Sequence, residues 1–214
     1  MSNDLPKEKF SKCVLVGLCQ SGKSSFLGQL INKTFDPQYS PTIGADFAKY
    51  KLTKDHSLGI FDCTGHSGIT FLLPTYLKRA NFVLIFVNPS LDGIDDWSTS
   101  FGKFLESFSD IISPLYLNCE PNDIPHFAFI CTHSDRPYVN ISYREELRTT
   151  FSTNLKQNVP IFRVSSQSGD GIDNVVNDFF NSFDLSLGSH IIDPHVEVDT
   201  EEKEGSRWKF CTIL

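Results

Sequence analysis

A loop with the residue types of a phosphate-binding site lies near the start of the chain. Residues 17–24 read GLCQSGKS, which matches the pattern GxxxxGK[ST]. The apolar run at residues 13–16 predicts a buried strand before the loop, and apolar residues at helical spacing follow it to Ile31. Loop glycines and a helix N-terminus present backbone N–H groups to phosphate oxygens. The segment therefore predicts a phosphate site, and a glycine turn that binds nothing is the plainer alternative.

Two side chains of this loop, and one beyond it, have the chemistry to hold a magnesium nucleotide. Lys23 would reach the β- and γ-phosphates, and the Ser24 hydroxyl would ligate Mg²⁺. Asp62 follows the apolar run at residues 58–61, which is where a phosphate-loop protein places a second Mg²⁺-associated group. These residues predict a site built from segments that are distant in the sequence.

Strand and helix patterns alternate along the chain, and their order predicts the fold class. Strands are expected at residues 10–16, 45–52, 58–61, 81–87, 127–131 and 161–164. Helices are expected at residues 24–31, 95–112, 142–156 and 172–183, and loops at residues 32–44 and 113–125. The order predicts an α/β three-layer sandwich, with helices on both faces of a mostly parallel six-stranded sheet and the ligand at its carboxyl edge.

The composition limits the classes of function. The 214 residues carry a net charge of −7, which argues against nucleic acid as a partner because that binding needs a basic face. The six cysteines have no CxxC or framework spacing and are expected as reduced thiols. No signal peptide or membrane-spanning run is evident. We expect a flexible N-terminus at residues 1–9, one domain at residues 10–185 and a flexible acidic tail at residues 186–214.

The order of these signals resembles the Ras superfamily of small GTPases, and the Rab branch most of all, over residues 10–184. Residues 41–47, PTIGADF, are similar to the Rab switch I segment, and residues 62–65, DCTG, match the DxxG box. The resemblance implies that Thr42 ligates Mg²⁺ and senses the γ-phosphate of GTP. It also implies that Asp62 acts on Mg²⁺ through water and that the Gly65 N–H meets the γ-phosphate.

The two base-recognition boxes of the family are altered. Residues 132–135 read THSD in place of NKxD, and residues 165–167 read SSQ in place of SAK. Asp135 is retained and would accept hydrogen bonds from the guanine N1 and N2 hydrogens. Thr132 is too short to make all of an asparagine's bonds between loops, and His133 lacks an aliphatic stem to lie along the base. We therefore expect GTP and GDP binding with a guanine preference and weakened affinity.

The resemblance gives each predicted residue a role. The nucleotide-binding residues are expected to be Gly17, Gln20, Ser21, Gly22, Lys23, Ser24, Ser25, Phe35, Thr42, Gly65, Thr132, His133, Asp135, Ser165, Ser166 and Gln167. The Mg²⁺ ligands are expected to be Ser24, Thr42 and Asp62, and the catalytic residues Lys23, Gly65 and His66.

His66 bears on catalysis, because the family has at this position a glutamine that orients the attacking water. Phosphoryl transfer depends on positioning and electrostatics, and an imidazole differs from a carboxamide in reach and donor placement. We therefore expect a GTPase with very slow intrinsic hydrolysis. A mobile switch residue that points to water is the plainer alternative for His66. The switch regions offer no internal arginine finger, so fast turnover would need a GTPase-activating protein.

Phe47, Phe61 and Tyr76 stand at the positions of the aromatic triad on which Rab effectors dock. Ordinary packing between strands is the alternative for Phe47 and Phe61. The resemblance implies effectors on switch I and switch II, an exchange factor and a GTPase-activating protein as partners.

The last four residues, CTIL, fit a CaaX prenylation signal at Cys211, and a final leucine favours geranylgeranyl. A terminal cysteine that arose by accident is the alternative. One lipid chain anchors a protein reversibly. We therefore expect a protein on the cytoplasmic face of an endomembrane or the plasma membrane that exchanges with the cytosol on a prenyl-binding carrier.

The sequence thus predicts a Rab-like small GTPase, a membrane-associated switch in vesicle trafficking. The first alternative is a nucleotide-binding scaffold of the same fold with weak guanine specificity and little or no hydrolysis, which His66 and residues 132–133 favour. The second is a phosphate-loop metabolic kinase, which should carry an arginine-rich lid. Residues 66–80 supply only Arg79, which speaks against it.

Overall fold

Six strands form a single sheet in the order β2-β3-β1-β4-β5-β6. The computed structural model describes residues 8–66, 71–91, 97–117, 119–120, 123–136 and 157–183. The strands are β1 Lys9–Gly17, β2 Ala45–Thr53, β3 His56–Cys63, β4 Phe82–Val87, β5 His126–Cys131 and β6 Ile161–Arg163. Only the pairing of β2 with β3 is antiparallel, and the other four pairings are parallel. The predicted α/β class with a mostly parallel six-stranded sheet is confirmed.

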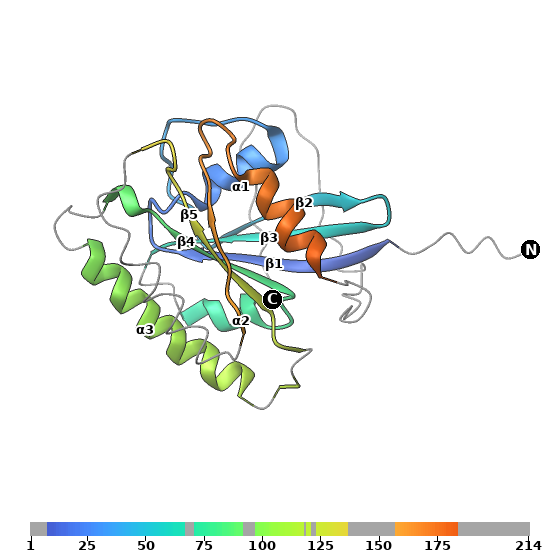
Figure 1. Ribbon diagram of the computed structural model, residues 1–214. Helices are drawn as coiled ribbons and strands as arrows, with labels where there is room; N and C mark the ends of the chain where they lie inside the picture. The colour runs from blue at the N-terminus through green and yellow to red at the C-terminus, as the bar shows by residue number, and fades with distance from the viewer. Residues whose placement is uncertain are drawn as a thin grey trace, which may run out of the picture.

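Helices cover both faces of the sheet (Figure 1). The helices α2 Leu73–Leu77 and α3 Trp97–Tyr116 lie on one face. The opposite face carries α1 Lys23–Asn32 and a C-terminal segment that begins with α5 Ile172–Asn174. A short 3₁₀ turn at Pro89–Leu91 follows β4. Each face of the sheet therefore has its own apolar layer, as expected of a three-layer sandwich.

The central strand β4 reads FVLIFV, and all six of its residues are buried. Successive side chains of a strand point to opposite faces of the sheet. Accordingly Val83 and Ile85 pack in the layer with α2 and α3, whereas Leu84 and Phe86 pack in the layer with α1 and α5. A continuous apolar run is thus required here, because both faces of β4 are covered by helices.

The helix α3 continues to Tyr116, although the sequence predicted its end at Ile112 and a loop from residue 113. Ile112 and Tyr116 are four residues apart, and both are buried on the side of α3 that faces the sheet. The Tyr116 hydroxyl also donates a hydrogen bond to the Leu77 carbonyl at 2.9 Å, which ties α3 to α2. These contacts offset the cost of Pro114 inside the helix, and the predicted loop was wrong for residues 113–116.

The C-terminal segment is helical, but it is not a regular α-helix. After α5 it continues as a π-helical turn at Val175–Phe179 and a 3₁₀ turn at Phe180–Ser182. The Phe82 ring contacts both Phe179, at 5.6 Å between centroids, and Phe180, at 5.1 Å. Both rings therefore face the sheet, and they lie where the π turn gives way to the 3₁₀ turn. The apolar face predicted for this segment is nevertheless buried.

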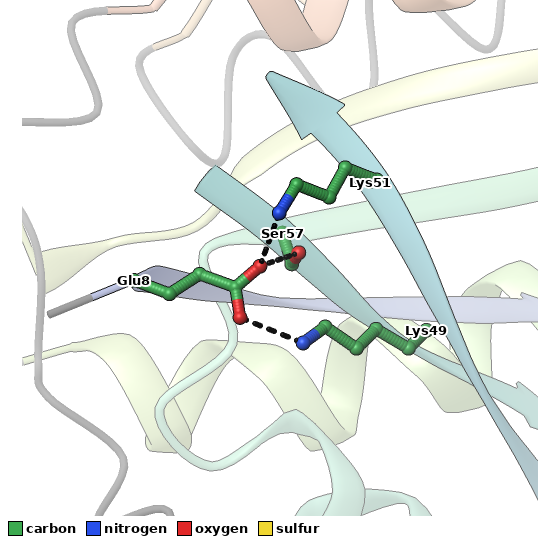
Figure 2. A network of polar contacts seen from close by, with 4 residues as sticks. All are labelled: Glu8, Lys49, Lys51 and Ser57. Atoms are coloured by element: carbon green, nitrogen blue, oxygen red, sulfur yellow. Dashed lines mark hydrogen bonds and ion pairs between the residues drawn. The ribbon is translucent and has the colours of Figure 1, made fainter. Parts of the chain in front are cut away.

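The sheet begins earlier than the predicted domain boundary at residue 10. Glu8 accepts hydrogen bonds from Lys49 Nζ at 2.8 Å, Lys51 Nζ at 3.2 Å and Ser57 Oγ at 2.6 Å (Figure 2). These bonds lower the pKa of Glu8 to about 2. These hydrogen bonds therefore attach Glu8, the residue before β1, to β2 and β3. The predicted flexible N-terminus was wrong for Glu8 and Lys9.

Some predictions fall outside the described residues. These are the helix at residues 142–156, the start of α3 at residue 95 and the tail from residue 186 with Cys211. The short helix α2, in contrast, was not predicted, because five residues with a proline near the start give no periodic signal. Within the described part of the chain, none of the helices combines the length and apolar character that a bilayer crossing requires.

Candidate nucleotide-binding site

The phosphate loop between β1 and α1 has a backbone that needs its glycines. Gly17 has a φ of 148°, and a Cβ there would lie 2.7 Å from the Phe86 carbonyl oxygen. Gly22 has a φ of 90°, and a Cβ there would lie 3.0 Å from Thr132 Cγ2. Gln20 also has a positive φ, 61°, although it is not a glycine. The loop therefore packs closely against the ends of β4 and β5 at the carboxyl edge of the sheet.

The Lys23 side chain folds back into this loop. Its ammonium donates to the carbonyl oxygens of Gly17 at 2.9 Å and Leu18 at 2.8 Å, and to Ser21 Oγ at 3.2 Å. Burial lowers the pKa of Lys23, and the nearby Asp62 carboxylate opposes that shift. A buried ammonium that already faces the interior of the loop is placed to meet an anion that enters there.

The three predicted Mg²⁺ ligands come from three segments and meet at one point. Ser24 Oγ donates to Asp62 Oδ2 at 2.5 Å and lies 3.1 Å from Thr42 Oγ1. Thr42 Oγ1 lies 3.5 Å from the same Asp62 oxygen. Ser24 opens α1, Thr42 lies in the segment between α1 and β2, and Asp62 lies near the end of β3.

Asp62 has the features of a carboxylate that serves a cation. It is 1% exposed, and its Oδ1 has no hydrogen-bond partner among the described residues. Burial raises the pKa of Asp62 to about 6, against the lowering effects of the Ser24 hydrogen bond and the Lys23 charge. Because a buried carboxylate oxygen without a partner is costly, a hydrated cation at this position would satisfy it. The residues present therefore fit Mg²⁺, a hard cation that prefers oxygen ligands and keeps several waters.

The DxxG segment packs directly on the phosphate loop. The Cys19 N–H donates to the Gly65 carbonyl at 3.2 Å. A Cβ at Gly65 would lie 2.3 Å from the Leu18 carbonyl carbon, so only glycine fits. His66, the next residue, is exposed, and its N–H donates to Thr64 Oγ1 at 3.2 Å. The structure thus places Gly65 against the loop and His66 at the surface beside it.

Thr132 bridges the phosphate loop and the end of β4, and the expectation that it makes fewer bonds than an asparagine would stays a prediction. It is 1% exposed, and its Oγ1 lies 2.9 Å from the Ser21 carbonyl oxygen and 3.1 Å from that of Val87. Its Oγ1 also lies 2.9 Å from His133 Nδ1. A hydroxyl has only one proton, so when that proton goes to a carbonyl, His133 Nδ1 is the donor in the last bond. The close packing of Thr132 on Gly22 is what brings so short a side chain within reach.

The two altered base-recognition boxes lie side by side. The Ser134 N–H donates to the Val164 carbonyl at 3.1 Å, which joins residues 132–135 to the segment that starts at Ser165. A hydrogen bond from the Ser165 side chain lowers the pKa of Asp135, whose side chain is exposed. Asp135 is therefore ionised at neutral pH and open to a ligand. Ser166, the residue after Ser165, is buried.

Three more predicted residues lie near the ends of elements at this edge. Ser25 is half-buried in the first turn of α1, Phe35 is 39% exposed just after that helix, and Gln167 is exposed after β6. Their roles toward a nucleotide stay predictions.

Sequence reasoning missed Asn88, which follows β4 and touches the phosphate loop. It is 3% exposed, and its Nδ2 donates to the Gln20 carbonyl at 3.0 Å. Its Oδ1 accepts from the Ser90 N–H at 3.1 Å and the Ser90 hydroxyl at 2.6 Å. A polar residue directly after a buried apolar strand, at the carboxyl edge, was the signal that could have found it.

The predicted aromatic triad is contiguous in space. The Phe47 and Phe61 rings meet edge to face at 5.1 Å between centroids, and the Phe61 and Tyr76 rings lie 6.1 Å apart. Lys12 Nζ lies 4.9 Å from the centre of the Phe61 ring. All three rings are half-buried. This geometry is compatible both with packing across β2, β3 and α2 and with a partly open docking surface.

The sheet order, the glycine-dependent loop and the Ser24–Thr42–Asp62 cluster together define a phosphate-loop protein of the α/β class. Residues 12–113 match the family described as "Ras of Complex, Roc, domain of DAPkinase". The chain is 26% identical over 179 residues to Ras-related protein Rab-7b of Paramecium octaurelia, covering 80% of each chain. It is 25% identical over 173 residues to Ras-related protein RABG3d of Arabidopsis thaliana, covering 76% of each.

A further relative is the DnaJ homolog subfamily C member 27 of Danio rerio, 22% identical over 179 residues, which span 80% of this chain and 60% of that protein. Together with the motifs, these similarities support a likeness to the Rab-like proteins of the Ras superfamily. GTPase chemistry with a guanine nucleotide and Mg²⁺ is what this superfamily implies in general.

Proposed function

We propose that this chain is a guanine-nucleotide-dependent switch that binds GTP and GDP with Mg²⁺, hydrolyses GTP slowly and acts on a membrane in vesicle trafficking. The observation that carries the proposal is the meeting of Ser24, Thr42 and Asp62, because it joins the phosphate loop to both segments expected to sense the γ-phosphate. Asp62 Oδ1, which has no hydrogen-bond partner in the described part of the chain, supports a cation at that point.

Each part of the site has a task in this proposal. Backbone N–H groups of residues 17–24 hold the phosphates, and the Lys23 ammonium exchanges its loop carbonyls for phosphate oxygens. Ser24 and Thr42, with Asp62 acting through water, would hold Mg²⁺, which would supply positive charge against the β- and γ-phosphates. Thr42 and the Gly65 N–H make contacts that exist only with the third phosphate, so its loss releases both segments.

Base selection and hydrolysis follow from the altered residues. The ionised, exposed Asp135 accepts the guanine N1 and N2 hydrogens, a pair of contacts that adenine does not offer. His66 stands where a water-orienting amide is expected, and its exposed position leaves the attacking water poorly oriented. Intrinsic hydrolysis is therefore slow, and a GTPase-activating protein supplies the missing group.

Partners and location rest on features outside the nucleotide site. Effectors dock on Phe47, Phe61 and Tyr76, whose contiguous, half-buried rings support a docking role. Prenylation of Cys211 anchors the chain reversibly, and a prenyl-binding carrier returns it to the cytosol. The Cys211→Ser variant should move to the soluble fraction in cell fractionation, and equal solubility of both proteins would contradict the anchor.

The decisive test is the nucleotide itself. The purified wild type should retain or bind GDP and GTP in the presence of Mg²⁺, in preference to ATP, and Lys23→Ala should lower that affinity by at least about a hundredfold. No guanine nucleotide bound at millimolar concentration, or an unaffected Lys23→Ala variant, would contradict the switch. Binding without discrimination against ATP, or without any single-turnover hydrolysis, would favour a nucleotide-binding scaffold, which the His66 and Thr132–His133 replacements favour.

A further inference from the structure

The phosphate loop contains a backbone conformation that something must hold in place. Gln20 has a φ of 61°, in the left-handed region that costs a residue with a Cβ more than it costs glycine. Such a residue persists only where its surroundings fix it. The Gln20 carbonyl is bonded by Asn88 Nδ2 at 3.0 Å, so Asn88 is the side chain in contact with the strained peptide.

The Asn88 amide is itself held in one orientation. Its Oδ1 accepts from both the N–H and the hydroxyl of Ser90, at 3.1 and 2.6 Å. With the oxygen committed to Ser90, the amide nitrogen has to face Gln20. Asn88 is 3% exposed, so water does not compete easily for these bonds. The short turn after β4 therefore fixes the orientation of the Asn88 amide, so that its N–H group donates to the phosphate loop.

A second side chain, that of Thr132, holds the next peptide of the loop through the Ser21 carbonyl. The Thr132 hydroxyl, from the end of β5, lies 2.9 Å from the carbonyl oxygen of Ser21. The carbonyl of one residue and the N–H of the next point in opposite directions across a trans peptide. Holding the Gln20 and Ser21 carbonyls on the sheet therefore directs the N–H groups of Ser21 and Gly22 into the loop. The Ser21 N–H does point across it, toward the Leu18 carbonyl at 3.3 Å.

We propose that Asn88 is a positioning residue for nucleotide binding, which fixes the left-handed Gln20 peptide so that the following N–H groups face the phosphates. The proposal rests on the guanine-nucleotide switch proposed above. Two neighbouring strands then support the loop: Asn88, after β4, holds the Gln20 carbonyl, and Thr132, after β5, holds the Ser21 carbonyl. Asn88 then complements Thr132, whose single hydroxyl proton serves only one carbonyl at a time.

The test measures release of GDP from the full chain with Mg²⁺, together with unfolding by urea. Asn88→Ala should release GDP about tenfold faster, because the loop loses a buried hydrogen bond and the support of a strained peptide. Adding Gln20→Gly should bring release back to within about threefold of wild type, because glycine adopts this φ without strain. If Asn88 only stabilised the fold, Gln20→Gly would not slow the GDP release of the Asn88→Ala variant.

Asn81→Ala is the matched control. Asn81 precedes β4, and its Oδ1 accepts the Lys12 N–H at 2.8 Å at the other end of the strand. This variant should lose stability but release GDP at the wild-type rate. If Asn88→Ala does not fold, Ser90→Ala replaces it and should speed release about threefold, because the Asn88 amide keeps only one of its two anchors.

The outcomes separate the two proposals. A wild type that binds no GDP removes the proposed function. A wild type that binds GDP overturns the role of Asn88 if Asn88→Ala, or Ser90→Ala in its place, releases GDP at the wild-type rate. Failure of Gln20→Gly to rescue Asn88→Ala also overturns it, as does an Asn81→Ala variant that releases GDP equally fast.

Discussion

Replacing Thr132 by valine is the sharpest test of how the base end of the site supports the phosphate loop. Valine has the shape of threonine, so the packing on Gly22 is kept while the hydroxyl is lost. The Ser21 carbonyl loses a donor, and His133 Nδ1 loses its hydrogen-bond partner. The Val87 carbonyl keeps a partner, because the backbone N–H of residue 132 still donates to it at 2.9 Å.

The size of the effect follows from this count. A buried polar group left without its partner costs about 1–3 kcal/mol. Counting only the fully buried Ser21 carbonyl, the variant should lose about 1–3 kcal/mol of unfolding free energy, which lowers Tm by roughly 2–12 °C in a domain of this size. The part of this cost that acts on the Ser21 peptide should also speed nucleotide release, by about tenfold for each 1.4 kcal/mol.

Thermal unfolding and GDP release of the same preparations measure the two effects. Thr132→Ser is the control, because it keeps the hydroxyl and removes only a methyl group, worth about 0.8 kcal/mol. We expect Thr132→Ser to release GDP at nearly the wild-type rate and Thr132→Val to release it several-fold faster. The reasoning is refuted if the valine variant matches wild type in both Tm and release.

Three further perturbations test other parts of the structure. Burial holds the pKa of Asp62 near 6, above its unfolded value, so the ligand-free fold binds a proton more tightly than the unfolded chain does. Its unfolding free energy should fall by up to roughly 3 kcal/mol as pH rises from about 4 to about 6, and Asp62→Asn should remove this slope in urea titrations. Glu8, with its pKa lowered to about 2 from 4.5, should add stability that is lost as pH falls between these values; Glu8→Gln should abolish this acid dependence, and added salt should weaken it. Gly65→Ala should weaken GTP binding more than GDP binding in calorimetry, because a Cβ 2.3 Å from the Leu18 carbonyl carbon displaces the segment expected to contact the γ-phosphate.

Each of these has a clear contrary result. A wild-type stability that is flat between pH 4 and 6 would mean that the Asp62 carboxyl is not buried. Equal acid sensitivity of wild type and Glu8→Gln would show that the bonds of Glu8 to β2 and β3 do not stabilise the fold. An alanine at residue 65 that binds GTP and GDP as wild type does would show that the DxxG segment does not pack on the phosphate loop.

The fold could be predicted to a large extent because its signals are local. The run at residues 82–87 is apolar on both faces, and β4 occupies it. The end of α3 and the π turn at Val175–Phe179 could not be predicted, because they depend on the sheet beneath them. Tyr116 stays helical because it reaches Leu77 on another helix, and no local pattern reports that contact.

The candidate site divides in the same way. The phosphate loop is one contiguous motif, so its residues and its glycines were predictable from the sequence. The bonds of Thr132 to the phosphate loop could not be predicted, because its reach depends on how closely the end of β5 lies to Gly22. Asn88 was missed, because its importance depends on the fold of the loop opposite it and on Ser90, which orients its amide.

Sequence patterns alone were enough to predict the α/β class, the succession of the six strands along the chain and the chemical groups available at the carboxyl edge. These follow from spacing along the chain, which sets local backbone geometry and burial. The meeting of Ser24, Thr42 and Asp62 depends on the folded chain, as do the bonds by which residues after β4 and β5 each hold one peptide of the phosphate loop. Those contacts join residues distant in the chain, and their distances are set by the packing of the whole sheet rather than by any single segment.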